Sequence, residues 1–259
     1  MIFIRSLLFN ILFYGFTTLV CVFMAPVVLM PRKVILATTK FYVGSVAYLE
    51  KYVLNLTYEV RGIEHLPKSG TYIVAAKHQS AYETMKLHHL FGDPTIVLKE
   101  SLTRIPIFGI FLKKLDVIAI NRSNKEESMK SIIEGAKRMS KQDRPIVIFP
   151  QGTRVAVNKS TKQAPYKGGI VKMHAQTNLP IIPMALNSGL FWGRNSFIKR
   201  PGKVIFEFLP PIEAGLPDKK VLQALEHRLE ENSLALMREA KEKYPYLNTI
   251  PTLEHLPEK

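Results

Sequence analysis

Cysteine is almost absent from this chain of 259 residues, and its single example, Cys21, lies inside an apolar segment. One cysteine cannot form a disulfide within the chain, and it does not otherwise identify a compartment. Zinc-binding spacing is also missing. His88 and His89 have no set of cysteines or carboxylates around them, and there is no HExxH motif. The chain also lacks internal repeats. We therefore expect neither a disulfide framework nor a metal site.

Acidic residues are outnumbered, with 21 Asp and Glu against 36 Lys and Arg, for a formal charge of +15. This balance favours a polyanionic partner, either nucleic acid or an anionic membrane surface. Charged residues are missing altogether from residues 6–31. As a helix rising about 1.5 Å per residue, that segment would exceed the roughly 30 Å of a bilayer core. Such an apolar segment is not expected in a soluble nucleic-acid-binding protein, so we expect a membrane partner and no nucleic acid.

The apolar segment has one alternative interpretation, a cleaved signal peptide. It is longer than a usual signal core, and no clear small-residue cleavage site follows it. Arg5 precedes the segment, whereas Arg32, Lys33 and Lys40 follow it. If the segment spans the bilayer, this bias places the rest of the chain in the cytoplasm. Whether the segment spans the membrane or enters one leaflet stays open.

A second segment, residues 41–58, contains only two charged side chains, Glu50 and Lys51. Its apolar residues recur at helical spacing, which predicts an amphipathic helix. Such a helix could lie on the membrane or pack on the protein. The two segments together make residues 1–60 an expected two-helix membrane anchor. Residues 61–259 have a suitable length for one further domain.

Apolar runs and helical patterns alternate after Gly62, which predicts an α/β domain with a mixed, largely parallel sheet covered by helices. In such sheets, ligands bind beyond the carboxyl ends of the strands. The strands are expected at residues 71–76, 95–98, 117–120, 145–149, 180–186 and 203–208, and the helices at 81–90, 125–140, 169–176 and 219–243.

The sequence KHQSAYETM follows the first of these strands and contains His78 and Glu83. Ser80 followed three residues later by Glu83 is a capping box, so Glu83 could simply cap a helix. The same box would start the helix near Ala81 and leave His78 in the preceding turn. A carboxylate in the first helical turn could then hold the histidine as a general base. The two interpretations share one geometry.

Two further motifs follow predicted strands. In FPQGTR, the backbone at Gly152 allows close approach of a ligand, Thr153 offers a hydroxyl, and Arg154 suits a phosphate. The segment from Lys99 to Gly109 places cations beside an apolar loop, which could accept a charged head and an acyl chain together. Either motif alone could be an ordinary turn or connection.

In combination, these motifs resemble the ordered blocks of the glycerolipid acyltransferase family, over residues 62–211. The set includes His78 and Glu83, the loop after Lys99, Arg122 in INR, FPQGTR, and the sequence LPIIP. The closest likeness is to the bacterial 1-acylglycerol-3-phosphate O-acyltransferases. Two positions depart from the family pattern: Glu83 stands where aspartate is usual, and Gln151 stands where glutamate is usual. The first keeps the charge and the second removes it.

The resemblance implies transfer of an acyl group from acyl-CoA or acyl-carrier protein to the sn-2 hydroxyl of a lysophosphatidate, without a cofactor. It implies His78 and Glu83 as the catalytic pair, in a cytoplasmic domain at the inner membrane of a bacterium. It also implies that the substrate contacts Lys99, Arg122, Gln151, Gly152, Thr153 and Arg154.

Other functions remain open at this stage. Because Gln151 stands where glutamate is usual, an acyltransferase for another lyso-lipid, such as one containing an amino acid, is an alternative function. The positive charge alone would also suit a non-catalytic protein that binds anionic lipid. A serine nucleophile at Ser188 is not favoured, because its surroundings do not form a GxSxG elbow.

Overall fold

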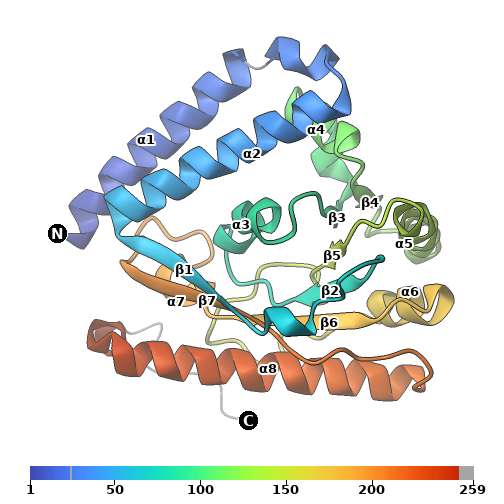
Figure 1. Cartoon of the computed structure of the whole chain (residues 1–259). Coiled ribbons are helices and arrows are strands. Elements are labelled where there is room, and N and C mark those ends of the chain that lie inside the picture. Colours follow the sequence, from blue (N-terminus) through green and yellow to red (C-terminus); the bar gives the residue numbers. More distant parts are fainter. Residues whose placement is uncertain (24, 251–259) are drawn as a thin grey trace.

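The computed structural model describes residues 1–23 and 25–250. Met24 and residues 251–259, which the sequence analysis assigned to the anchor and to the following domain, lie outside the described residues. Within them, seven strands form one sheet in the order β1-β7-β6-β2-β5-β3-β4 (Figure 1). The strands are β1 (Leu56–Arg61), β2 (Ile73–Ala76), β3 (Thr95–Lys99), β4 (Ile118–Ile120), β5 (Ile146–Ile148), β6 (Ile181–Leu186) and β7 (Gly202–Phe208).

Neighbouring strands in this sheet pair in parallel, except that β7 runs antiparallel to β6. The predicted α/β fold with a mixed, largely parallel sheet is therefore confirmed. All six predicted strands are present within two residues of their expected bounds. Strand β1 was not predicted, since its residues continue a helical apolar pattern and only pairing with β7 makes them a strand.

Helices cover both faces of the sheet, with α3 (Tyr82–Phe91) on one side and α8 (Asp218–Lys243) on the other (Figure 1). Strand β2 is buried on both faces, so its alternating side chains enter two different cores. Val74 belongs to the core that contains Leu87 of α3. Ile73 belongs to the core that contains residues of α5 (Lys125–Ser140), α6 (Gly169–Thr177) and α8. Two short helices, α4 (Phe108–Lys114) and α7 (Ser188–Phe191), were not predicted.

Two long helices form an N-terminal hairpin, α1 (Ile2–Phe23) and α2 (Arg32–Leu49), with a 3-10 turn at Ala25–Leu29 between them. Helix α1 is long and apolar enough to cross a membrane by length and composition, and it is the one such helix in the described residues. The amphipathic helix predicted at residues 41–58 is wrong at both ends. Pro31 precedes α2, because its fixed φ suits the start of a helix. At the other end, a π-helical turn at Glu50–Leu54 leads through Asn55, in the left-handed conformation, into β1.

The first half of α1 is docked on the rest of the protein. Ser6 and Asn10, one turn apart, are buried and bind the segment before β7. The Ser6 hydroxyl accepts from the backbone N–H of Lys199 at 3.0 Å, and Lys199 Nζ donates to Asn10 Oδ1 at 2.7 Å. Phe9 packs edge-on against Trp192, with ring centroids 5.4 Å apart. The second half of α1 contacts α2 instead: the hydroxyls of Thr17 and Tyr42 are 2.9 Å apart. This half also exposes Leu19, Val22 and Phe23.

A buried ion pair joins the hairpin to α3. Lys86 of α3 donates to Glu50, at the end of α2, and both side chains are at most 1% exposed. Burial raises the pKa of Glu50 to about 7, although the Lys86 ammonium opposes the shift. Burial likewise lowers the pKa of Lys86 against the Glu50 charge. The Lys86 ammonium also lies 4.6 Å from the ring centroid of Tyr82.

We predict that Lys86→Met lowers the free energy of unfolding by about 3–5 kcal/mol, because it leaves Glu50 buried without its partner. The double variant Lys86→Met with Glu50→Met should recover much of that loss, since no buried charge remains. Denaturant unfolding in detergent measures both. Lys130→Met is the matched control, because Lys130 forms an exposed ion pair with Glu134 and should cost at most about 1 kcal/mol. Equal losses at Lys86 and Lys130 would contradict the prediction.

Candidate functional site

The turn between β2 and α3 brings His78 and Glu83 together. His78 lies in the turn after β2, and Glu83 lies in the first turn of α3. His78 Nδ1 and Glu83 Oε1 are 2.8 Å apart, which is hydrogen-bonding distance. The geometry expected from KHQSAYETM, with the histidine outside the helix and the carboxylate inside it, is therefore present.

Glu83 also caps α3. Its Oε1 accepts from the backbone N–H groups of Gln79 and Ser80, each at 2.7 Å. The Ser80 hydroxyl accepts from the N–H of Tyr82 at 3.0 Å, one residue earlier than the Glu83 N–H of a standard capping box. Capping and holding the histidine are thus done by one carboxylate, and neither interpretation of the motif excludes the other.

The second oxygen of Glu83 binds Ser188, at the start of α7. The Ser188 hydroxyl donates to Glu83 Oε2 at 2.6 Å, and both side chains are fully buried. One residue further, the Gly189 N–H donates to Gln79 Oε1 at 3.0 Å. Sequence reasoning considered Ser188 only as a nucleophile and missed this contact, because the two residues are 105 positions apart. The hydroxyl proton of Ser188 is therefore used in the hydrogen bond to Glu83.

The imidazole of His78 stacks on the ring of Phe149, with centroids 3.9 Å apart and an interplanar angle of 21°. Its side chain is 17% exposed. With Nδ1 facing the carboxylate, Nδ1 carries the proton and donates it, so Nε2 keeps a lone pair. Nε2 is therefore the nitrogen that can accept a proton from a bound molecule.

The predicted cations follow the strands next to β2. In the order β2-β5-β3-β4, His78 follows β2, Arg154 lies after β5, Lys99 ends β3, and Arg122 lies after β4. These strands are parallel, so all four residues belong to the same edge of the sheet. Val155, which directly follows FPQGTR, connects this segment to the histidine turn, because its N–H donates to the carbonyl oxygen of His78 at 2.7 Å. Lys99 and Arg122 lie one and two strands beyond β5.

Part of the FPQGTR segment makes contacts within the protein. Gln151 is buried, and its Nε2 donates to the carbonyl oxygen of Ala164 at 2.9 Å. Its Oε1 is buried without a partner among the described residues. Gly152 has φ of 70°, a left-handed conformation that glycine adopts without strain. Thr153 is exposed.

Lys167 also reaches this turn, and sequence reasoning missed it. Its backbone N–H donates to the carbonyl oxygen of Pro150 at 3.0 Å. A Cβ atom at Gly152 would lie 3.0 Å from Lys167 Nζ, so the lysine side chain runs over the glycine. The sequence carries no signal for this placement, because Lys167 follows no strand and lies 15 positions after Gly152.

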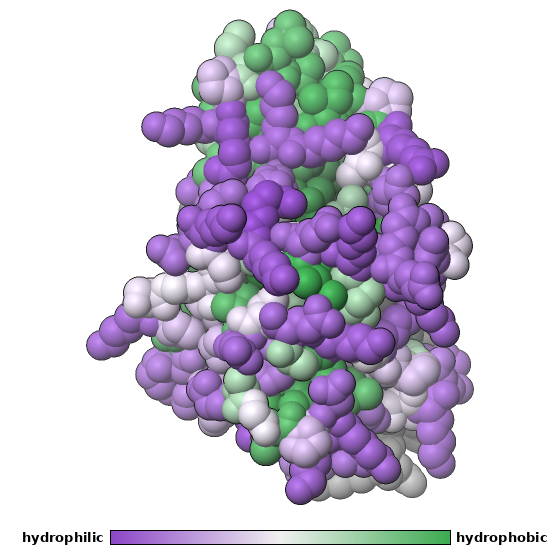
Figure 2. Space-filling model, turned by 90° about the vertical axis from the view of Figure 1, so that its right-hand side faces the viewer, coloured by the Kyte–Doolittle hydropathy of each residue, from purple (hydrophilic) through white to green (hydrophobic). Residues whose placement is uncertain are grey.

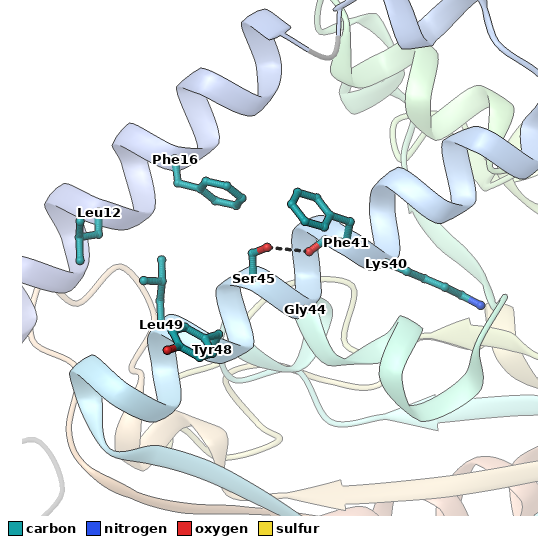
Figure 3. A pocket seen from close by; sticks show the side chains of 8 residues that line it. All are labelled: Leu12, Phe16, Lys40, Phe41, Gly44, Ser45, Tyr48 and Leu49. Atoms are coloured by element: carbon teal, nitrogen blue, oxygen red, sulfur yellow. Dashed lines mark hydrogen bonds between the residues drawn. The ribbon is translucent and has the colours of Figure 1, made fainter.

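A large groove lies elsewhere, in the N-terminal hairpin, and holds none of the predicted site residues (Figure 3). It has a volume of about 600 Å³ and opens between α1 and α2. Its lining is mainly apolar, from Leu12, Phe16, Lys40, Phe41, Gly44, Ser45, Tyr48 and Leu49.

Comparison with known proteins identifies the family. The model of the family described as "Acyltransferase" matches residues 57–187. A 1-acyl-sn-glycerol-3-phosphate acyltransferase of Pseudomonas aeruginosa is 31% identical over 71% of this chain and 70% of that protein. An uncharacterized acyltransferase of Schizosaccharomyces pombe is 28% identical over 68% of this chain, and the match spans 62% of its length.

A solved structure shares the fold. The crystal structure of the 1-acyl-sn-glycerophosphate acyltransferase PlsC from Thermotoga maritima aligns with a TM-score of 0.71 and 21% sequence identity. The alignment covers 91% of this chain and 98% of the other. The family match covers the strands that carry His78, Lys99, Arg122 and Arg154. The chain therefore belongs to the acyltransferase family.

Proposed function

We propose that this protein transfers a fatty acyl group from acyl-CoA or acyl-carrier protein to the sn-2 hydroxyl of 1-acylglycerol 3-phosphate, giving phosphatidic acid. The observation that carries the proposal is the hydrogen bond between His78 and Glu83, beside the segment that contains Arg154. The activity of the Pseudomonas aeruginosa relative, a 1-acyl-sn-glycerol-3-phosphate acyltransferase, supports the choice of lysophosphatidate as acceptor.

The proposed reaction uses His78 as a general base. Nε2 takes the proton of the acceptor hydroxyl while its oxygen attacks the thioester carbonyl carbon. The carbon–sulfur bond then breaks, and the imidazolium returns the proton to the departing thiolate. Glu83 keeps the proton on Nδ1 and stabilises the imidazolium by its charge. Ser188 and the N–H groups of Gln79 and Ser80 hold the carboxylate in place. No acyl-enzyme is needed.

Arg154 is proposed to bind the acceptor phosphate, with Lys99 and Arg122 contributing charge along the same edge. Its guanidinium can make paired, charge-assisted hydrogen bonds to phosphate oxygens. Its segment is fixed to the histidine turn by the bond from Val155 to His78. A phosphate held there would bring the nearby hydroxyl toward Nε2.

An acyltransferase for another lyso-lipid is the second candidate. Gln151 favours it, because a neutral amide stands at this edge and its side-chain oxygen is buried without a partner among the described residues. Assays of one purified protein with both thioester donors and several lyso-lipid acceptors separate the two candidates.

The hairpin is proposed to bind the membrane by its tip, in one leaflet. The first half of α1 contacts Lys199 and Trp192, and a helix that crossed the whole bilayer would lose these contacts. Hydrophobic side chains gather at the hairpin end of the molecule, above a mainly hydrophilic surface (Figure 2). The tip is joined to α4 by Lys114, which donates to the carbonyl oxygen of Met30 at 2.7 Å. The exposed apolar residues there are Leu19, Val22, Phe23, Leu29, Met30, Ile105, Phe108 and Ile110.

Glu83→Gln tests the catalytic pair. Glutamine can still accept from His78 and the two N–H groups through its oxygen, and its amide can donate to Ser188, so the fold should survive. The negative charge is lost, and turnover should fall by roughly 10² to 10⁴. His78→Ala should fall at least as far, and the two together should fall little further. Glu83→Asp keeps the charge and should retain far more activity than the glutamine variant. A folded Glu83→Gln protein with near-normal turnover would refute the catalytic pair.

Arg154→Ala tests phosphate binding. One charge-assisted hydrogen bond is worth roughly 1.5–3 kcal/mol, so kcat/KM for lysophosphatidate should fall about ten- to a hundredfold. The loss should be much smaller with a monoacylglycerol, which lacks the phosphate. Arg194→Ala is the matched control, because Arg194 is exposed in the segment before β7. Equal losses with both acceptors would place Arg154 in the scaffold or at the reacting atoms.

The membrane proposal is tested by charging the hairpin tip. Wild-type protein should stay with membranes in high salt, because apolar burial holds it. Val22→Asp with Leu29→Asp should be released, since each aspartate costs about 2.5–3.5 kcal/mol inside a bilayer. Leu216→Asp, which charges an exposed leucine just before α8, should behave like wild type. Release of wild-type protein by salt alone would show that surface charge holds it.

A further inference from the structure

Lys167 is the last residue of a long segment that leaves the FPQGTR turn and returns to it. Its N–H donates to Pro150, and its side chain runs over Gly152. Phe149, three residues before Gly152, stacks on the His78 ring. The lysine ammonium therefore lies at the turn that packs against the histidine and is followed by Arg154.

The position of Lys167 is fixed by buried contacts of its neighbours. The Gln151 amide donates to Ala164 at 2.9 Å, which ties the returning segment to the turn. The Tyr166 hydroxyl donates to Glu230 of α8 at 2.7 Å. Glu230 is also the ion-pair partner of Lys77, the buried residue that immediately precedes His78. The same network thus holds the base of the histidine turn and the backbone beside Lys167.

Lys167 is exposed, and among the described residues its ammonium has neither a hydrogen bond nor an ion pair. The two buried neighbours that position its backbone, Gln151 and Tyr166, are both neutral, and Glu230 is already paired with Lys77. Arg154, two residues after Gly152, adds a second cation to the same turn. Within the described residues, neither Lys167 nor Arg154 is paired with a carboxylate, and two such cations at one turn suit a ligand with phosphate oxygens.

We propose that Lys167 is an additional substrate-binding residue, whose ammonium binds a phosphate group over Gly152. The proposal rests on the proposed function and names a further contact in the same site. The phosphate could belong to the lyso-lipid acceptor or to the phosphopantetheine portion of the thioester donor. Both sources share the chemistry, and binding experiments separate them.

The test measures dissociation constants in nonionic micelles for lysophosphatidate, for a monoacylglycerol of equal chain length, and for coenzyme A. Lys167→Met removes the charge and keeps most of the length. Its binding of the phosphate-bearing ligand should weaken about ten- to a hundredfold, with monoacylglycerol binding unchanged. Lys167→Arg should retain most of the affinity. Lys162→Met is the matched control, because Lys162 is an exposed lysine of the same segment.

The ligand affected identifies the source of the phosphate. Weaker binding of lysophosphatidate alone assigns Lys167 to the acceptor, and weaker binding of coenzyme A alone assigns it to the donor. Affinities of Lys167→Met equal to those of Lys162→Met for both ligands would overturn the inference. These measurements need no turnover. An absence of acyl transfer by the wild-type protein would therefore defeat the proposed function without deciding the role of Lys167.

Discussion

The carboxylate of Glu83 is fully buried, and the arrangement of the histidine turn depends on the hydrogen bonds to its two oxygens. A buried charge is tolerated only where it is well paired or hydrogen-bonded. Here the donors are His78, two backbone N–H groups and Ser188. The same four contacts start α3, orient the imidazole and attach α7 to the turn. The Glu83 carboxylate therefore serves both the local structure and the proposed chemistry.

Helix α3 is fixed at a second point by the ion pair of Lys86 with Glu50. Glu83 and Lys86 are three residues apart, so they lie on neighbouring parts of one helix. One contact orients the histidine, and the other joins the helix to the end of the hairpin. Because both side chains are buried, water cannot replace either partner. A movement of the hairpin that separated Glu50 from Lys86 would therefore leave a buried charge unpaired on α3.

Much of this arrangement follows from the sequence alone. Alternating apolar runs and helical patterns predicted the α/β fold, because local periodicity reflects which face of each element is buried. Polar residues after successive strands predicted a shared edge, since parallel strands end on the same side. The five-residue spacing in KHQSAYETM required the histidine to lie outside the helix, and Nδ1 is indeed 2.8 Å from Glu83 Oε1. The motifs in combination also resembled those of the acyltransferase family.

Tertiary structure decided what local patterns cannot express. The sequence determined an apolar N-terminal helix, but only docking of Ser6 and Asn10 on the segment near Lys199 decided that its first half is covered by protein. Strand β1 exists because β7 pairs with it, although its own residues continue a helical pattern. Ser188 and Lys167 reach the site through contacts between residues distant in the chain. Periodicity records which side of an element is apolar, whereas the partner of that side is set by the packing of the whole chain.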